Sequence, residues 1–417
     1  MTALLDRSEP DAAEIPFAIE DMFFTRTDKR GVIAAGNAVF QRMSGFAWQQ
    51  LIDAPHRILR HADTPRAVFH LMWRTIQAGE PCVVYLRNTT RDGRAYWGIA
   101  TVFPLSDGYL SVGIKPTSTL FATARTLYAA LALAEREEGL SPEASEHRLI
   151  TELAKLGYPD YQSFMQAALL AEYRARNSNP ALSGFFSEND KVAASLDSTS
   201  KLQIDLLRSF DRLRDLPTNM RIIAARLEPS GGPISAISDI YSATSGELFQ
   251  EITAFAEGRK SLSRRMQGSF ERAIFLRICA LLQAEVVMRA SSESIDHGDI
   301  DRRIEPEMLG QLRRQCEAQA NTGLIEAEQL AGAINRAASD LRRSMLGLDT
   351  IRVMGRVESG RLGAEGNRIG ATIDQIDVCH SGIIGLLQRI MDNAAVVSSG
   401  ISAIRNQSNA KSALAAR

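Results

Sequence analysis

The sequence has few cysteines and no strong charge of one sign. Four cysteines occur in 417 residues, far apart and without CxxC spacing, so we expect neither a disulfide framework nor a zinc centre. The formal net charge is −1, and no overall field therefore attracts nucleic acid or anionic lipid. These absences argue against a nucleic-acid partner and favour a reducing, cytoplasmic setting.

Long apolar runs are also missing. The longest, 280–288, is interrupted by Glu285 and bounded by Arg277 and Arg289, whereas a membrane-spanning helix needs about 20 apolar residues in succession. Residues 1–20 are acidic and lack the apolar segment of a signal peptide. The sequence therefore predicts no membrane insertion and no secretion signal.

Catalytic signatures are absent too. The chain contains no GxSxG nucleophile motif, and no glycine-rich phosphate loop follows a predicted strand. Apolar residues make up 45% of the chain and charged residues 23%, which is ordinary for globular proteins. From this length we expect two or three domains, and we expect the protein not to be an enzyme.

The first part of the chain has the pattern of a small α+β domain. An arm at 1–16 precedes a domain that we place at 17–118. Asn37 and Gly45 bound a short helix, since asparagine favours helix starts and glycine favours helix ends. Apolar runs bounded by turn residues predict strands at 23–27, 32–35, 82–88, 96–103 and 109–114. Together these elements predict a five-stranded antiparallel sheet with short helices.

Aromatic and charged side chains gather between residues 55 and 97. Two of the three tryptophans and three of the six histidines fall in this stretch, among arginines and aspartate. Flat apolar rings beside fixed charges suit a pocket for a planar, polar cofactor. An ordinary domain core with a charged rim has a similar composition, so composition alone leaves both interpretations open.

Residues 37–116 also carry motifs at a characteristic spacing. A Pro-His-x-x-x-Arg-His-x-Asp-x-Pro run is followed by Met-Trp, by Gly-Glu-Pro and by Gly-x-x-Tyr-Trp. This arrangement resembles the flavin-binding PAS domain of bacterial aerotaxis receptors. The matching residues are His56, Arg60, His61, Asp63, Pro65, Phe69, Met72, Trp73, Gly79, Glu80, Pro81, Asn88, Gly93, Tyr96 and Trp97.

The resemblance implies a PAS fold with an FAD pocket. The helical side of that pocket would carry an arginine, a histidine and an aspartate, and the strand side an asparagine. The predicted cofactor contacts are Arg60, His61, Asp63, Trp73, Cys82, Asn88 and Trp97.

Two residues depart from the family's pattern. Cys82 stands where the family has a tryptophan that helps to hold the flavin, and Ala62 stands where it has a proline. Loss of an indole removes a large contact area. Haem bound by His56, His61 or His70 is an alternative to flavin, and so is an empty pocket.

From residue 117 the pattern becomes helical. A connector at 119–187 leads to a long helical region at 188–405 and a flexible tail at 406–417. Apolar residues between 190 and 228 recur at three- and four-residue steps, which is typical of a coiled-coil seam. An amphipathic helix on a globular core gives the same pattern. Pro217 predicts a kink or a break in this helix.

An internal repeat favours the coiled-coil interpretation. Each copy is a helix, a turn and a returning helix, and the turn of the first copy is shortened. Residues 219–228 parallel 349–358, and 234–241 parallel 369–376, with hairpin tips near 229–233 and 359–366. We expect an all-α region in which the two long antiparallel hairpins pack on each other within one chain as a bundle.

The repeat resembles the cytoplasmic signalling hairpin of methyl-accepting chemotaxis proteins. The second copy matches the family's tip motif at Val357, Glu358, Arg361, Gly363 and Gly366, and the first keeps Ala224, Ala225 and Glu228. In that family the tips contact a chemotaxis coupling protein and a histidine kinase. By this resemblance the partner-binding residues are Glu228, Glu358 and Arg361.

Both resemblances together imply a cytoplasmic signal-transduction protein of the aerotaxis and chemotaxis type, which senses redox state or oxygen through a bound flavin. The main alternative is a scaffold or decoy, in which the PAS domain serves only for homodimerisation and the bundle binds chemotaxis partners without activating them. A haem-based sensor is a weaker alternative. A flavin oxidoreductase is weaker still, because so small a domain offers no second substrate site.

Overall fold

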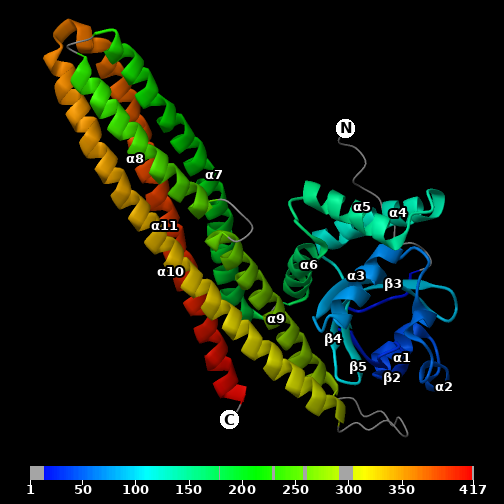
Figure 1. Ribbon diagram of the computed structural model, residues 1–417. Helices are drawn as coiled ribbons and strands as arrows, with labels where there is room; N and C mark the ends of the chain where they lie inside the picture. The colour runs from blue at the N-terminus through cyan, green and yellow to red at the C-terminus, as the bar shows by residue number, and fades with distance from the viewer. Residues whose placement is uncertain (1–13, 178, 228–230, 257–260, 291–303, 416–417) are drawn as a thin grey trace. The chain divides into compact units, whose positions relative to one another are not determined.

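The structure is a computed structural model of the chain (Figure 1). It describes residues 14–177, 179–227, 231–256, 261–290 and 304–415. By internal contacts the chain divides into two compact units. The first comprises 1–178 with 271–320, and the second comprises 179–270 with 321–417.

Within the described part of the first unit, five strands form one antiparallel sheet in the order β2-β1-β5-β4-β3. This confirms the predicted fold class of the N-terminal domain. The strands are β1 (Met22–Asp28), β2 (Ile33–Gly36), β3 (Cys82–Thr89), β4 (Ala95–Pro104) and β5 (Gly108–Ile114).

Asn37 fixes the path from the sheet into the first helix, as its sequence position suggests. Its Oδ1 accepts the backbone N–H groups of Phe24 and Phe40, and its Nδ2 donates to the carbonyl of Met22. Gly45 ends the helix at φ 71°, in the left-handed region that glycine tolerates. One side chain thus joins the β1 backbone to the helix start.

Helices cover both faces of the sheet. The segments between β2 and β3 lie on one face. On the other face, aromatic residues of α4 contact Tyr85 and Trp97, and Glu172 of α6 accepts from the Tyr85 hydroxyl. The helices of this unit before residue 178 are α1 (Ala38–Ser44), α2 (Trp48–Leu51), the 3₁₀ turn η1 (His56–Leu59), α3 (Arg66–Gln77), α4 (Thr119–Glu137), α5 (Pro142–Lys155) and α6 (Tyr161–Arg176).

Residues 271–320 belong to the first unit by their contacts, although we predicted them as part of the bundle at 188–405. They comprise most of α9 (Leu262–Ala290) and the first part of α10 (Ile304–Arg361). Arg176 of α6 pairs with Glu285 at 2.6 Å, and Phe275 contributes to a cavity beside β3. In this part of α9 the apolar residues Phe275, Ile278 and Leu282 are buried. The predicted linker at 291–301 lies outside the described residues.

The second unit is an antiparallel helical bundle (Figure 1). Its long helices are α7 (Ser183–Ala225), α8 (Gly232–Ala256), α10 and α11 (Asn367–Ala415), and the turns include η2 (Pro180–Leu182) and η3 (Gly363–Gly366). The α7 helix continues through Pro217, so the predicted break is wrong. Pro217 is buried among the packed helices, and this packing keeps α7 continuous although proline removes one backbone hydrogen bond.

The two hairpin tips pack on each other around a shared apolar cluster. It contains Met220 and Ala224 of α7, Ile234 and Ile237 of α8, and Ile369 and Ile373 of α11, with Ile351 of α10 and Leu362 of the turn after α10 packed against it. All four helices therefore contribute to one core at this end.

The hairpins are equivalent, but in a different register from the one we predicted for their first arms. Arg221 pairs with Asp239 at 3.0 Å, as Arg356 pairs with Asp374 at 2.6 Å.

The turns repeat this equivalence. A Cβ placed on Gly231 would lie 2.1 Å from the Ala224 carbonyl oxygen, and one on Gly366 would lie 2.1 Å from that of Ser359. In every such pair the two residue numbers differ by the same amount, so the pairing of 219–228 with 349–358 is out of register. The first turn is also not shortened, since the interval from arginine to glycine is equal in both copies.

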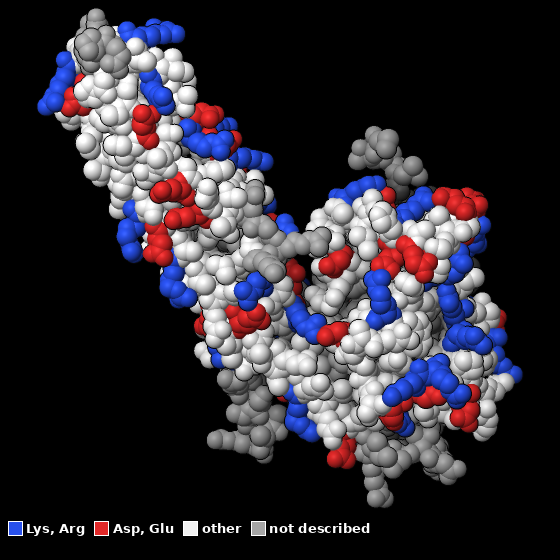
Figure 2. All heavy atoms as spheres, in the orientation of Figure 1, with Lys and Arg blue, Asp and Glu red and all other residues white. Residues whose placement is uncertain are grey.

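None of the described helices is long and apolar enough to span a membrane. On the face shown in Figure 2, described Lys and Arg side chains are interspersed with Asp and Glu side chains. This mixture agrees with the near-zero net charge of the sequence.

Candidate functional site

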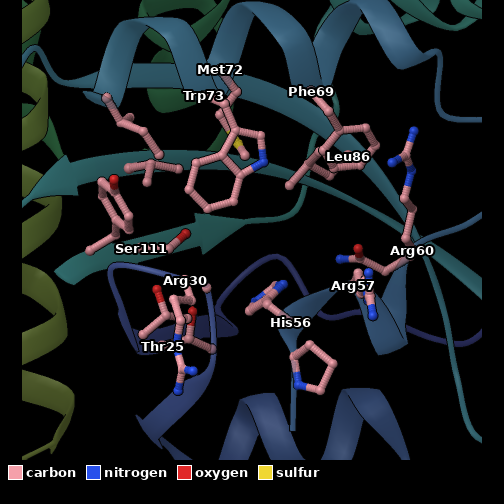
Figure 3. A pocket seen from close by; sticks show the side chains of 17 residues that line it. Thr25, Arg30, His56, Arg57, Arg60, Phe69, Met72, Trp73, Leu86 and Ser111 are labelled. Atoms are coloured by element: carbon pink, nitrogen blue, oxygen red, sulfur yellow. The ribbon is translucent and has the colours of Figure 1, made fainter. Parts of the chain in front are cut away.

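A cavity of about 460 Å³ lies between α3 and the sheet of the first unit (Figure 3). This volume falls in the range of small-molecule sites. One wall comes from α3 and the segment before it, and the other from β1, β3, β4 and β5. The lining residues are Thr25, Thr27, Arg30, Gly31, Pro55, His56, Arg57, Arg60, Phe69, Met72, Trp73, Ile76, Leu86, Asn88, Val102, Tyr109 and Ser111.

Aromatic rings form the helical wall of the cavity. Trp73 makes an edge-to-face contact with Tyr109 of β5, with ring centroids 5.4 Å apart. Gly31, at φ 78°, lies against the same indole, and a Cβ there would come within 3.2 Å of Trp73 Cη2. The Arg60 guanidinium lies 3.8 Å above the Phe69 ring. These contacts hold Trp73 and Phe69 as fixed apolar surfaces.

His56 presents an imidazole to this cavity. Its ring stacks on Phe40 with centroids 5.9 Å apart, and its backbone N–H donates to Gly31 at 2.8 Å. Burial lowers the pKa of His56 to about 4, because surrounding protein disfavours the charged imidazolium. At neutral pH the cavity therefore faces an uncharged ring that can both donate and accept a hydrogen bond.

Three arginines, Arg30, Arg57 and Arg60, lie at the rim of the cavity. Arg30 pairs with Asp28 at 3.3 Å, and both side chains are substantially exposed. Burial lowers the pKa of Arg60, while the charge of Glu135 opposes that shift. The rim is therefore cationic above an apolar interior, which suits a ligand with a flat body and an anionic tail.

Asn88 supplies the polar group of the strand wall. It is 7% exposed, and its backbone forms an isolated bridge with Arg60. Its side chain also hydrogen-bonds Tyr96, while burial raises the pKa of Tyr96. The structure thus brings Arg60, Trp73 and Asn88 together at one cavity.

His61 and Asp63 lie outside the cavity lining. Asp63 Oδ1 accepts from Arg136 at 2.9 Å and Oδ2 from Arg87 at 3.0 Å. His61 Nδ1 accepts the Asp63 backbone N–H at 3.1 Å. Burial opposes ionisation of Asp63, but the Arg136 hydrogen bond and the charges of His61 and Arg87 hold its pKa below the ordinary value. This group joins the segment before α3 to β3 and α4.

Trp97 and Cys82 are also placed away from the lining. Trp97 faces the opposite side of the sheet, where it makes an edge contact with Phe121 at 5.4 Å and lies beside Tyr128. Cys82 lines a second cavity of about 220 Å³ with Leu71 and other residues. Burial raises the pKa of the Cys82 thiol to about 12, so the thiol is not a nucleophile at neutral pH.

Sequence reasoning missed several lining residues. Arg30 and Tyr109 come from a turn and a strand outside the 55–97 stretch. The signal that could have found Tyr109 is strand alternation, since Tyr109 and Ser111 are two residues apart on β5 and share a face. Arg30 carries no such signal, because its place depends on how the β1–β2 turn meets α3.

Buried carboxylates connect the cavity wall to the helical connector. Glu135 of α4 accepts the backbone N–H groups of Arg66 and Ala67 at 2.8 and 3.2 Å, which caps the start of α3. Glu146 of α5 forms a paired contact with Arg74 of α3 at 3.0 and 2.6 Å. Thus α3 contacts the cavity with one face and the connector with the other.

The predicted tip residues lie in the second unit. Glu358 and Arg361 form an ion pair with each other at 2.6 Å, and the Arg361 side chain is 71% exposed. Glu228 lies outside the described residues. Among the residues that the structure describes, no group of His, Cys, Asp and Glu side chains is arranged to hold a metal ion.

The chain is similar in sequence to two kinds of known protein. The aerotaxis receptor of Escherichia coli (strain K12) is 33% identical over 121 residues, which are 28% of this chain and 24% of the receptor. A nitrogen fixation regulatory protein of Klebsiella pneumoniae is 36% identical over 70 residues, which are 17% of this chain and 14% of that protein. The sheet domain has the PAS fold. No family model matches the chain.

Solved structures similar to the chain are PAS and light-oxygen-voltage domains. A light-oxygen-voltage domain studied with a flavin analogue is 24% identical, with a TM-score of 0.23, and the match covers 25% of this chain and 82% of that one. A PAS domain from Colwellia psychrerythraea is 21% identical, with a TM-score of 0.20, covering 22% and 85%. The helical second unit resembles the signalling region of methyl-accepting chemotaxis proteins.

Proposed function

We propose that this protein is a non-enzymatic, cytoplasmic PAS sensor that holds FAD in the cavity beside α3 and responds to redox state or oxygen. The observation that carries the proposal is the cavity itself, with aromatic side chains inside and arginines at the rim. An isoalloxazine ring matches the flat interior, and a diphosphate matches the arginines. Similarity to an aerotaxis receptor over 121 residues, together with the resemblance of 37–116 to a flavin-binding PAS domain, supports this ligand class.

Each lining group has a defined part in holding such a ligand. Trp73 and Phe69 would contact the ring faces, and Asn88 and His56 would hydrogen-bond its polar edge. Arg57 and Arg60 would neutralise the phosphates. A bound flavin supplies reversible electron transfer that changes the protonation of its ring. The neutral imidazole of His56 can follow that change by exchanging donor and acceptor roles.

Transmission is proposed to begin at α3. A shift of the cavity face of α3 alters the geometry at its other face, where Glu135 and Glu146 hold it to the connector. These contacts are charge-assisted, so small displacements cost appreciable energy. The connector then biases the bundle between two packings, as a population shift. The output partner is a chemotaxis coupling protein or a histidine kinase at the hairpin tips, where Glu228, Glu358 and Arg361 lie in sequence.

The direct experiment is the absorbance spectrum of the full-length protein after incubation with FAD and removal of free ligand. We expect a flavin spectrum in stoichiometric amount. Trp73→Ala and Asn88→Ala should each weaken retention by about tenfold, the effect of roughly 1.4 kcal/mol. Trp97→Phe is the matched control, because Trp97 lies on the other face of the sheet, and it should retain FAD like the wild type.

Other spectra identify the alternatives. A haem Soret band that His56→Ala abolishes would replace the flavin proposal with a haem sensor, since among the described histidines His56 lines the cavity. A colourless protein with an intact PAS domain by circular dichroism would favour the scaffold or decoy. Steady oxidation of reduced nicotinamide would show that the protein is a flavin oxidoreductase.

A further inference from the structure

The equivalence of the two hairpins shows which residues occupy corresponding positions in the bundle. Arg221 corresponds to Arg356, Gly231 to Gly366, and Ile234 to Ile369, at one constant interval. The same interval relates the ion pair of Arg208 and Asp205 to that of Arg343 and Asp340. A bundle of this kind could form equally well from two identical hairpins of different chains. The residues that break the equivalence therefore show which pairing the sequence prefers.

The first difference between the two hairpins is a buried polar contact, the layer formed by Tyr241 and His380, which has no counterpart at the corresponding positions. The Tyr241 hydroxyl of α8 and Nε2 of His380 on α11 lie 2.5 Å apart, and these residues are 1% and 2% exposed. The corresponding positions are Ile376 and Ser245, which are also buried. We call α7 with α8 hairpin one, and α10 with α11 hairpin two. The hydroxyl–imidazole contact thus exists because hairpin one supplies the tyrosine and hairpin two supplies the histidine.

Charged groups of α10 and α11 surround the same histidine. Nδ1 of His380 lies 3.7 Å from Asp349, and Arg352 bridges Asp349 at 2.8 Å and Asp377 at 3.1 Å. The nearby carboxylate favours a proton on Nδ1, which makes Nε2 the acceptor of the Tyr241 hydroxyl. Pro217 stands at the position that corresponds to Arg352. The first hairpin therefore has no counterpart of this network.

The second break lies at the tip. Met220 and Gly355 occupy corresponding positions and face each other, since a Cβ on Gly355 would lie 3.9 Å from Met220 Cε and 3.6 Å from Ile237. A large side chain from one hairpin thus meets the open space left by glycine in the other. Two copies of hairpin one would oppose two methionines, and two copies of hairpin two would oppose two glycines.

We propose that the two hairpins are complementary halves that select each other within one chain and disfavour pairing between identical hairpins of two chains. Self-pairing of hairpin two would leave His380 opposite Ile376, buried without its hydroxyl partner. Self-pairing of hairpin one would place Tyr241 opposite Ser245. Single buried polar groups specify partner and register in helical assemblies in this way. The proposal does not depend on the ligand of the PAS domain.

The test introduces a cysteine pair into the full-length chain. Ile237→Cys and Gly355→Cys face each other across the two hairpins, and Cys379→Ser removes a half-buried native thiol. After oxidation this chain should run as an internally cross-linked monomer on a non-reducing gel. Adding Tyr241→Ile and His380→Ser makes each layer position identical to its counterpart. Self-pairing places position 237 opposite Met220 and position 355 opposite Thr372, so the introduced thiols then form no disulfide. We therefore expect the ratio of internally cross-linked to uncross-linked chain to fall about tenfold, and the uncross-linked chain to sediment as a dimer whose fraction rises with protein concentration.

The matched control replaces exposed neighbours, with Ile240→Ala and Val378→Ser in the same cysteine chain, and should give the internal cross-link. If the chain with the natural layer stays uncross-linked and sediments as a dimer, the proposal is overturned. It also fails if the altered layer gives the internal cross-link alone while helicity is retained. If the double variant loses helicity, Tyr241→Phe, which removes only the hydroxyl, must raise the dimer fraction for the proposal to stand.

Discussion

At the scale of single residues, Glu172 connects the sheet of the PAS domain to its helical connector. It is fully buried, and its carboxylate accepts from the Tyr85 hydroxyl of β3 at 2.8 Å and from Ser118 N and Oγ, before α4, at 2.9 and 2.7 Å. One α6 side chain thereby joins the outer face of the sheet to the start of the connector. Removal of an acceptor with several buried donors leaves those donors unpaired.

We therefore expect Glu172→Ala to lower the free energy of unfolding by about 3 kcal/mol or more. Glu172→Gln should also destabilise, because its amide presents donors toward donors. Glu152→Ala is the control, since the Glu152 side chain is partly exposed and forms a surface ion pair with Lys155, and it should change stability by less than about 0.5 kcal/mol. Chemical denaturation measures the free energy of unfolding of each variant, and the values are compared where the variants share the same m-value. Equal stabilities of the Glu172 and Glu152 variants would contradict this assignment.

His56 gives the PAS domain a defined pH dependence. Its folded pKa of about 4 is below the ordinary 6.5, so the unfolded state binds the proton more readily. Its contribution to stability is complete above pH 6.5 and is lost as the pH falls toward 4. The loss should reach about 2 to 3 kcal/mol, given about 1.4 kcal/mol per pKa unit and some access from the cavity.

Comparison of unfolding free energies for wild type and His56→Phe at pH 7 and pH 4.5 measures this effect. Asp63 also loses stabilisation in acid because its folded pKa is depressed, but that loss is common to both proteins. The variant should therefore show the shallower decline. Parallel curves would show that His56 is not the group that titrates.

For single residues, the sequence predicted which side chains belong to the PAS domain better than it predicted which of them face the cavity. Trp97 was expected at the cavity but faces away from it, because β4 is buried along nearly its whole length. Alternation between apolar and polar residues, which reveals the face of a strand, is then lost. Asn88 and Arg60 were placed at the cavity by resemblance alone, and the geometry that joins them is a backbone bridge that no motif encodes.

At the scale of elements, the helix boundaries were well predicted where capping residues mark them. Asn37, the predicted start of the first helix, accepts a backbone N–H there, and Gly45, its predicted end, lies in the left-handed region. The register of the repeat was predicted correctly for the returning helices, 234–241 with 369–376, but not for the first arms. Apolar residues recur so regularly along α7 and α10 that several registers align them equally well, and only the ion pairs and turn glycines of the fold distinguish among these.

The tip turns allow a direct test of the new register. A Cβ at Gly366 would lie 2.1 Å from the Ser359 carbonyl oxygen, so Gly366→Ala forces a backbone shift, and Gly231→Ala should do the same against Ala224. We expect each to destabilise the bundle by about 2 kcal/mol. Gly382→Ala is the control, because nothing lies within 4 Å of that position in α11.

The control should be neutral or should stabilise the bundle by up to about 1 kcal/mol, since alanine is the better helix former. Thermal unfolding, followed by circular dichroism, ranks the three variants by stability. A milder effect of Gly231→Ala than of the control would show that the two turns are not equivalent.

At the scale of the whole molecule, the division into two units determines where truncated fragments of the chain should begin and end. A fragment of 188–417 would carry 271–320 away from the PAS domain and expose apolar residues such as Phe275 and Ile278, which are buried in the full chain. We expect that fragment to bind a hydrophobic dye and to aggregate. A fragment of 179–417 in which a short glycine-rich linker replaces 271–320 should remain helical and monomeric.

Sedimentation and dye binding separate the two fragments. The linker is geometrically reasonable, because Arg265 and Glu326, on either side of the excised segment, approach within 3.5 Å. Equal dye binding by both fragments would show that 271–320 does not need the PAS domain to bury its apolar side chains. The sequence held a signal for this division, since the longest apolar run, 280–288, lies in α9, but it did not identify the unit that covers this run.

The covalent connection between the two hairpins has a consequence for the copy number of the protein in a cell. Two hairpins on separate chains assemble in a second-order step, so the assembled fraction falls on dilution. Hairpins on one chain assemble in a first-order step, with an effective concentration set by the connecting residues. The fraction of intact bundles is then independent of expression level. A cell that makes few copies of this protein would keep every one of them assembled.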